Sequence, residues 1–142
     1  MLGLNPTLII ETMAKPYLDT LPVDEAKAYV NDMVNSVGPN LQGQIDALEN
    51  KASAAKTKLT SVISQIPAFV AGVIASIAVP PAALSLKSDI ANMKVSVNDA
   101  NLALQEVSTT VSRWGIPTPP GLSTVIDMVN TASNLINTIP SF

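Results

Sequence analysis

Two pairs of carboxylates are the residues of this chain whose types and spacing could support chemistry. Asp24 and Glu25 are adjacent, and Asp46 and Glu49 stand three positions apart, close together on one helix face. Paired carboxylates can share the acid and base roles of a hydrolytic reaction. The first pair falls in the first turn of an expected helix, where negative charge is favoured. We therefore interpret both pairs as ordinary helical charges.

The remaining side chains argue against catalysis. The 142 residues include no His and no Cys, so the chain lacks an imidazole base, a thiolate and the commonest transition-metal ligands. It also has no phosphate-binding glycine loop and no EF-hand loop. We therefore predict no catalytic residue, no metal site and no cofactor, and we expect that the protein is not an enzyme.

The composition restricts the possible partners. The chain is 47% hydrophobic and 13% charged, with a net charge of −3 and no basic face, so nucleic acid is not an expected partner. Its N-terminal run MLGLNPTLIIETMAK lacks a basic region and includes Glu11, so we expect no signal peptide. The length fits a single domain.

Prolines mark the places where helices are expected to begin, because the first turn of a helix tolerates a missing N–H. Three such starts are Asn5-Pro6, Leu21-Pro22 and Gly38-Pro39. Gly38 is also expected to end a helix running from about Pro22 to Val37. The connector Pro117–Gly121 precedes a last expected helix, Leu122 to about Ile139. Because no alternating strand pattern occurs, the predicted fold class is all-α and bundle-like.

Two heptad seams, with apolar residues at alternating steps of four and three, are the strongest pattern in the chain. The first seam is Leu41, Ile45, Leu48, Ala52, Ala55, Leu59, Val62 and Ile66, and the second is Leu86, Ile90, Met93, Val97, Ala100, Leu104, Val107, Val111 and Trp114. Pro80 and Pro81 cannot continue a helix between them. Residues 41–79 and 80–114 are therefore predicted to form an antiparallel helical hairpin, flanked by the N-terminal helices of 1–40 and by the connector and last helix of 115–142.

The tip of this hairpin is the uncharged segment Ile66–Leu84, IPAFVAGVIASIAVPPAAL. Pro67 is expected either to kink the first arm or to split off a separate short helix. Between Pro67 and Pro80 only about 18 Å of helix remains, which is too short for a bilayer core of about 30 Å, so no full transmembrane span is expected. Gly72 and Ser76 form a small-xxx-small pair that would allow close helix approach.

Three interpretations of the tip are open: the core of a helical monomer, an oligomer interface, or a membrane contact. The second arm also carries Val95 and Leu102 on the face opposite its seam, and the other helices of one chain are too few to cover so much apolar surface. We therefore expect a homo-oligomer of three or more copies, or docking with other subunits of an assembly. The candidate interface residues are Ile66, Phe69, Gly72, Val73, Ser76 and Ile77 at the tip, and Leu86, Ile90, Met93, Val97, Leu104, Val107, Val95, Leu102 and Trp114 on the second arm.

A compact helical chain without Cys or His and rich in Ala, Val, Ser and Asn resembles the small structural proteins of tailed-phage particles. The resemblance rests on composition and assigns a role to no single residue. It implies an assembly subunit located in the virion, as a tail, neck or ejection component. The alternative function is a membrane-active or pore-forming helical protein that inserts residues 66–84.

Overall fold

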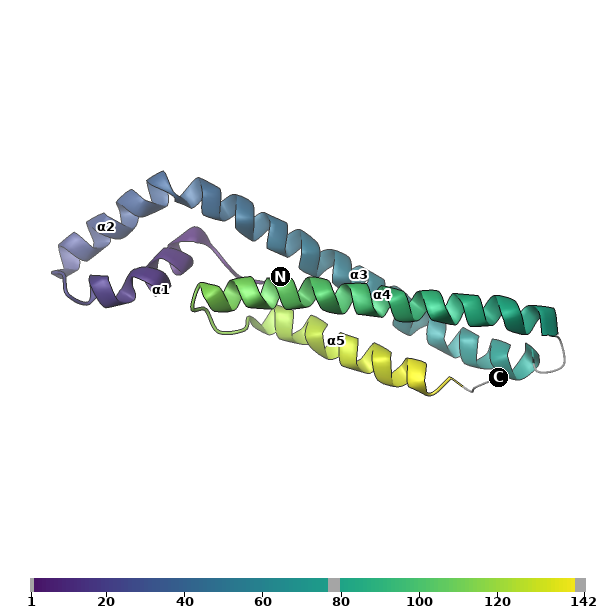
Figure 1. Ribbon diagram of the computed structural model, residues 1–142. Helices are drawn as coiled ribbons and strands as arrows, with labels where there is room; N and C mark the ends of the chain where they lie inside the picture. The colour runs from purple at the N-terminus through teal and green to yellow at the C-terminus, as the bar shows by residue number, and fades with distance from the viewer. Residues whose placement is uncertain (1, 77–79, 140–142) are drawn as a thin grey trace.

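The computed structural model describes residues 2–76 and 80–139, and over these residues the chain is all-α, as predicted. The helices are α1 (Pro6–Leu18), α2 (Val23–Ser36), α3 (Gly38–Ser76), α4 (Pro80–Arg113) and α5 (Pro120–Asn137). Figure 1 shows α3 and α4 as a long antiparallel hairpin, with α5 lying along it. The helices α1 and α2 form a shorter hairpin at the end opposite the tip, where both contact α3.

The core lies among α3, α4 and α5, and the two heptad seams supply most of it. Leu59 of α3 and Leu104 of α4 are almost completely buried. The helix α5 contributes its own buried stripe at steps of three and four, consisting of Leu122, Val125, Val129, Ala132 and Ile136. Because both seams are continuous, α3 and α4 pack against each other along the hairpin. Toward the tip, α3 and α4 run past the end of α5, which leaves this part of the hairpin without α5 beside it (Figure 1).

The helix starts follow the prolines, with one correction. Asn5 caps α1 by accepting a hydrogen bond at Oδ1 from the Leu8 N–H, 2.8 Å away. Gly38 was expected to end the preceding helix, but it is instead the first residue of α3. The N–H of Leu41 donates to the Val37 carbonyl at 3.0 Å, so helical bonding resumes at once after the change of direction. A Cβ on Gly38 would lie 3.6 Å from Val34 and 3.7 Å from Pro6, so this glycine sits where three helices meet.

Gly115 ends α4 in a left-handed conformation with φ of 75°. Its N–H donates to the Ser112 carbonyl at 2.9 Å, and the N–H of Ile116 donates to the Val111 carbonyl at 3.3 Å. These are the two hydrogen bonds of a Schellman motif. Trp114, just before the glycine, is only 7% exposed and packs in the core. The motif therefore fixes the direction in which the chain leaves α4 for α5.

The variant Gly115→Ala should lower the free energy of unfolding by about 1 kcal/mol, because a β-carbon is unfavourable at positive φ. The space itself is sufficient, since the nearest heavy atom would be Thr12 Cγ2 at 3.5 Å. Chemical denaturation of the two proteins measures the difference. Ser112→Ala is a matched control one turn earlier, because its side chain is exposed and α4 is helical there. Equal stability of Gly115→Ala and the wild type would contradict this account of the helix end.

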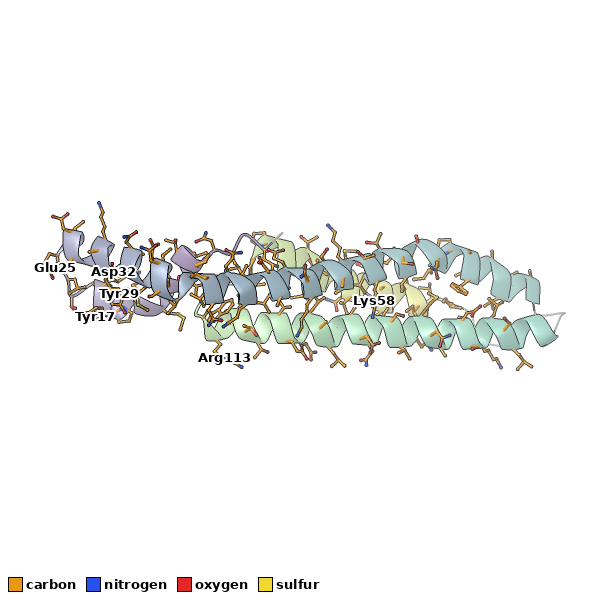
Figure 2. The ribbon with its side chains drawn as sticks, turned by 90° about the horizontal axis from the view of Figure 1, so that it is seen from above. Tyr17, Glu25, Tyr29, Asp32, Lys58 and Arg113 are labelled. Atoms are coloured by element: carbon orange, nitrogen blue, oxygen red, sulfur yellow. The ribbon has the colours of Figure 1, made fainter. Side chains whose placement is uncertain are left out.

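Pro67 does not split the first arm, because α3 continues as one helix of 39 residues through this proline. Figure 2 shows the last turns of α3 bending toward α4. The expectation that the apolar helix near the tip is limited by Pro67 is therefore wrong. A bend is enough to relieve the clash of the proline ring with the preceding turn. The predicted break at Val79-Pro80 lies partly outside the described residues, which resume with Pro80 as the first residue of α4.

Candidate interaction surface

The predicted seam residues of α4 are packed inside the chain itself. Most are buried, namely Ile90, Met93, Val97, Leu104, Val107 and Trp114, whereas Leu86 is half-buried. Their contacts are with α3 and α5, the two helices that pack against α4. A second chain could reach these side chains only if the bundle opened. The part of the predicted surface that remains accessible is therefore the opposite face of α4.

Several predicted tip residues are also covered by the hairpin. Ile66 and Val73 are buried, and Phe69 is half-buried against the core. A Cβ on Gly72 would lie 3.4 Å from the two terminal methyl groups of Leu86, so this small residue allows α3 and α4 to approach closely within the chain. The side chain of Ser76 and all of Ile77 lie outside the described residues.

The outer face of α4 carries the accessible apolar side chains. Val95 is 58% exposed, Leu102 is 51% exposed and Leu84, near the tip, is 69% exposed. On α3, Ile74 adds a further exposed side chain close to the tip. Val95 and Val97 are two positions apart, yet Val97 is only 6% exposed, which confirms that α4 has one buried and one exposed apolar face.

Two grooves border this outer face, one on each side. Lys94, Asn98 and Asn101 of α4 line a groove against α5, and Leu102 and Glu106 line another against α3. In the second groove the Nζ atom of Lys51 lies 2.6 Å from Glu106 Oε2. Both side chains are at least half exposed, so this ion pair contributes at most about 1 kcal/mol. The arrangement leaves the outer face as a narrow apolar stripe between charged and amide side chains.

The helical hairpin of α1 and α2 has exposed apolar residues that are not among those predicted from the sequence. Met13, Tyr17 and Val23 are all more than half exposed. The rings of Tyr17 and Tyr29 meet edge to face, with centroids 5.1 Å apart (Figure 2). The sequence contains a signal for this exposure. The segment that forms α1 has apolar residues on more than one side, whereas packing against one neighbouring helix covers only one side.

The carboxylate pairs have separate surroundings instead of a shared site. Glu49 Oε1 accepts a hydrogen bond from the Leu2 N–H at 2.8 Å, which holds the N-terminal segment against α3. Asp46 Oδ1 accepts from Gln42 Nε2 at 2.9 Å within the same helix. Asp24 and Glu25 are exposed in the first turn of α2. Over the described residues no group of three or more His, Cys, Asp or Glu side chains could hold a metal ion.

One helix among the described residues, α3, is long and apolar enough to cross a membrane when judged by length and composition alone. Its most apolar window of 18 residues has a mean hydropathy of 1.5, and only 22% of that window is buried in the fold. The core helix of a soluble bundle can be equally long and apolar, but most of such a helix is buried. The low buried share of this window is therefore more informative than its hydropathy.

Comparison with known proteins offers no relative whose role could be transferred. No protein-family model matches the chain, and neither a curated protein nor a solved structure matches it.

Proposed function

We propose that the protein is a structural subunit that associates with copies of itself through the outer face of α4 and the adjoining tip. The supporting observation is the exposure of Leu84, Val95 and Leu102 along one face of a helix whose opposite face packs against α3 and α5. Large apolar side chains gathered on one face are favourable to bury against a partner. The carboxylates, in contrast, are engaged separately or solvent-exposed, so the geometry supports assembly better than chemistry.

The proposed setting is a tailed-phage particle, in which the subunit would be a tail, neck or ejection component. The support is the composition of the chain, which resembles that of small virion proteins. An elongated helical hairpin with an apolar tip also suits a building block that packs side by side with its copies. Mass spectrometry of particles produced from the genome that encodes the chain should detect its peptides, and purified particles without them would contradict this setting.

Self-association itself is tested by light scattering of the purified full-length protein. We expect a mass above that of one 14.8 kDa chain at tens of micromolar in plain buffer. From the sequence we expect at least three copies, and the measured mass gives the copy number directly. A well-folded monomer throughout this concentration range would refute the proposed function.

The second candidate function, insertion of the tip into a membrane, is favoured by the unbroken α3 and the low burial of its apolar window. The charged residues of α4 near the tip argue against insertion into a membrane. Lys87 and Asp89 follow within about 15 Å of the first residue of α4, at 1.5 Å per residue. The folded hairpin would have to bring both charges into a hydrocarbon core of about 30 Å in order to cross it.

A flotation experiment separates the two functions. Full-length protein is mixed with neutral vesicles and, separately, with vesicles containing anionic lipid, and both mixtures are centrifuged through a density gradient. We expect the protein to stay at the bottom in both, because the tip has too little uncharged length on α4 and no basic cluster. Flotation with either kind of vesicle would instead favour the membrane function.

A further inference from the structure

We infer that the partner of α4 is the same helix of a second copy, aligned parallel and in register. This inference rests on the proposed self-association and specifies a pair of copies as its unit, where the sequence alone predicted three or more. The outer face of α4 repeats at steps of four and three, like the buried seam behind it. Its positions are Leu84, Ser88, Ala91, Val95, Asn98 and Leu102, and all of them are exposed. The spacing is that of a two-helix heptad seam.

The heptad register follows from the step sizes. In a heptad, the step from a to d is three residues and the step from d to the next a is four. Ser88, Val95 and Leu102 therefore take the a positions, because the next residue of the stripe follows each of them after three residues. The d positions are Leu84, Ala91, Asn98 and Gln105. In a parallel pair, Val95 and Leu102 of one copy would face the same residues of the other. Each contact would cover side chains that are now more than half exposed.

The charges that flank this stripe favour a parallel arrangement. Lys94 takes a g position and Asp99 takes the e position five residues later. In a parallel pair, a g residue of one helix lies beside the e residue five positions later in its partner. Lys94 of each copy would therefore meet Asp99 of the other, giving two equivalent ion pairs. Within one chain the same two side chains point in different directions around the helix, and neither has an ion-pair partner among the described residues.

An antiparallel pair would lose this complementarity. Antiparallel helices place g positions beside g positions, and those of α4 are Lys87, Lys94, Asn101 and Ser108. No acidic residue is present among them, so Lys94 would gain no partner. Among the e positions from 85 to 106, the charged residues are Asp99 and Glu106, and both are acidic, so Asp99 would gain no cationic partner there either.

Asn98 fixes the register of the parallel pair. Across the twofold axis its side-chain amide would face the same amide of the other copy, and two amides can hydrogen-bond to each other. A shift by one heptad would place Asn98 against Ala91 or Gln105 and would move Val95 away from its equivalent. A polar residue at a core position of a two-helix seam is a known means of selecting one register.

Single cysteines test the orientation directly, since the natural chain contains none. Ala91→Cys and Gln105→Cys are prepared separately in the full-length protein and treated with a short bismaleimide. In the parallel pair each variant should crosslink to itself, because equivalent residues face each other. In an antiparallel pair, a positions face d positions, so Val95 would lie opposite Asn98 of the partner. Equivalent cysteines would then be about 16 Å apart at position 91 and about 25 Å apart at position 105, and only a mixture of the two variants would bring cysteines close together. Ser53→Cys, on the exposed side of α3, is the control and should remain uncrosslinked.

A charge exchange tests the proposed ion pair independently. Lys94→Glu and Asp99→Lys should each weaken association about tenfold, because two attractions per dimer become repulsions. Combining both changes in one chain should restore association to within about threefold of the wild type. Concentration-dependent light scattering measures all four proteins. A double variant as weak as the single variants would overturn the parallel register.

The outcomes distinguish this inference from the function on which it rests. An oligomer in which neither cysteine crosslinks to itself would keep the proposed self-association and overturn the parallel pairing. Crosslinking only in the mixture of the two cysteine variants would also overturn it, in favour of the antiparallel arrangement. A monomeric wild type would remove both proposals together.

Discussion

Leu104→Asp is expected to unfold much of the bundle. The Leu104 side chain is 1% exposed in the core formed by α3, α4 and α5. Asp at this position would place a carboxylate among apolar side chains, and every Lys and Arg side chain of the described residues is exposed instead of buried in this core. The combined loss of packing and burial of a charge costs about 4 kcal/mol or more. That is a large share of the stability of a typical domain of about 5–15 kcal/mol.

Thermal unfolding followed by circular dichroism measures this effect. A loss of about 4 kcal/mol in a chain of this size corresponds to a midpoint lower by about 10–15 °C, and a larger loss would abolish the cooperative transition. Leu104→Ala tests the size of the packing contribution alone and should fall between the wild type and the Asp variant. A midpoint for Leu104→Asp within 2 or 3 °C of the wild type, by the same size relation, would show that the seam is assigned to the wrong face.

The long hairpin was predicted well from the sequence because the heptad pattern that indicates it is repeated many times. Each seam offers a series of apolar residues at heptad spacing, so a single misjudged residue does not change the pattern. Trp114 and Gly115 added a clear end to the second arm. The final helix was expected from Leu122, and it begins at Pro120 because the connector prolines also suit the first turn.

Single residues with two possible roles were harder to predict. A glycine followed by a proline is found both after a helix end and at a sharp bend between two helices. Gly38 proved to be the second case, because Val37 closes α2 without leaving the right-handed region. Pro67 was ambiguous for a similar reason, since a proline breaks or bends a helix according to the packing around it.

The candidate surface was only partly predictable for a physical reason. Periodicity identifies which residues share a helix face, but it does not say which face a neighbouring helix covers. The sequence placed Val95 and Leu102 opposite the seam, and the structure leaves both exposed. It did not distinguish the seam of α4 from a contact between chains, because heptads within a bundle and between chains look alike. The burial of Leu104 and Val107 resolves that ambiguity in favour of packing within the chain.

Leu102→Asp is expected to abolish self-association while leaving the fold intact. Leu102 is two residues from Leu104 in the same helix, but its side chain is 51% exposed, so an aspartate there remains hydrated. The free energy of unfolding of a single chain should change by no more than about 0.5 kcal/mol. In the associated state the same change would remove two leucines from the contact and bring two like charges together.

The association constant of Leu102→Asp should fall by about a hundredfold or more, since burial of two half-exposed leucines contributes about 3 kcal/mol. Light scattering should therefore give a monomer where the wild type is associated, whereas circular dichroism should show a helical, cooperatively melting protein. The pair Leu102→Asp and Leu104→Asp carries the same substitution in one helix, so helix propensity affects both equally. If Leu102→Asp is folded and still associates like the wild type, the outer face of α4 is not the contact, and the exposed residues of the α1–α2 hairpin become the next surface to test. This result would separate the question of whether the chain associates from the question of which face it uses.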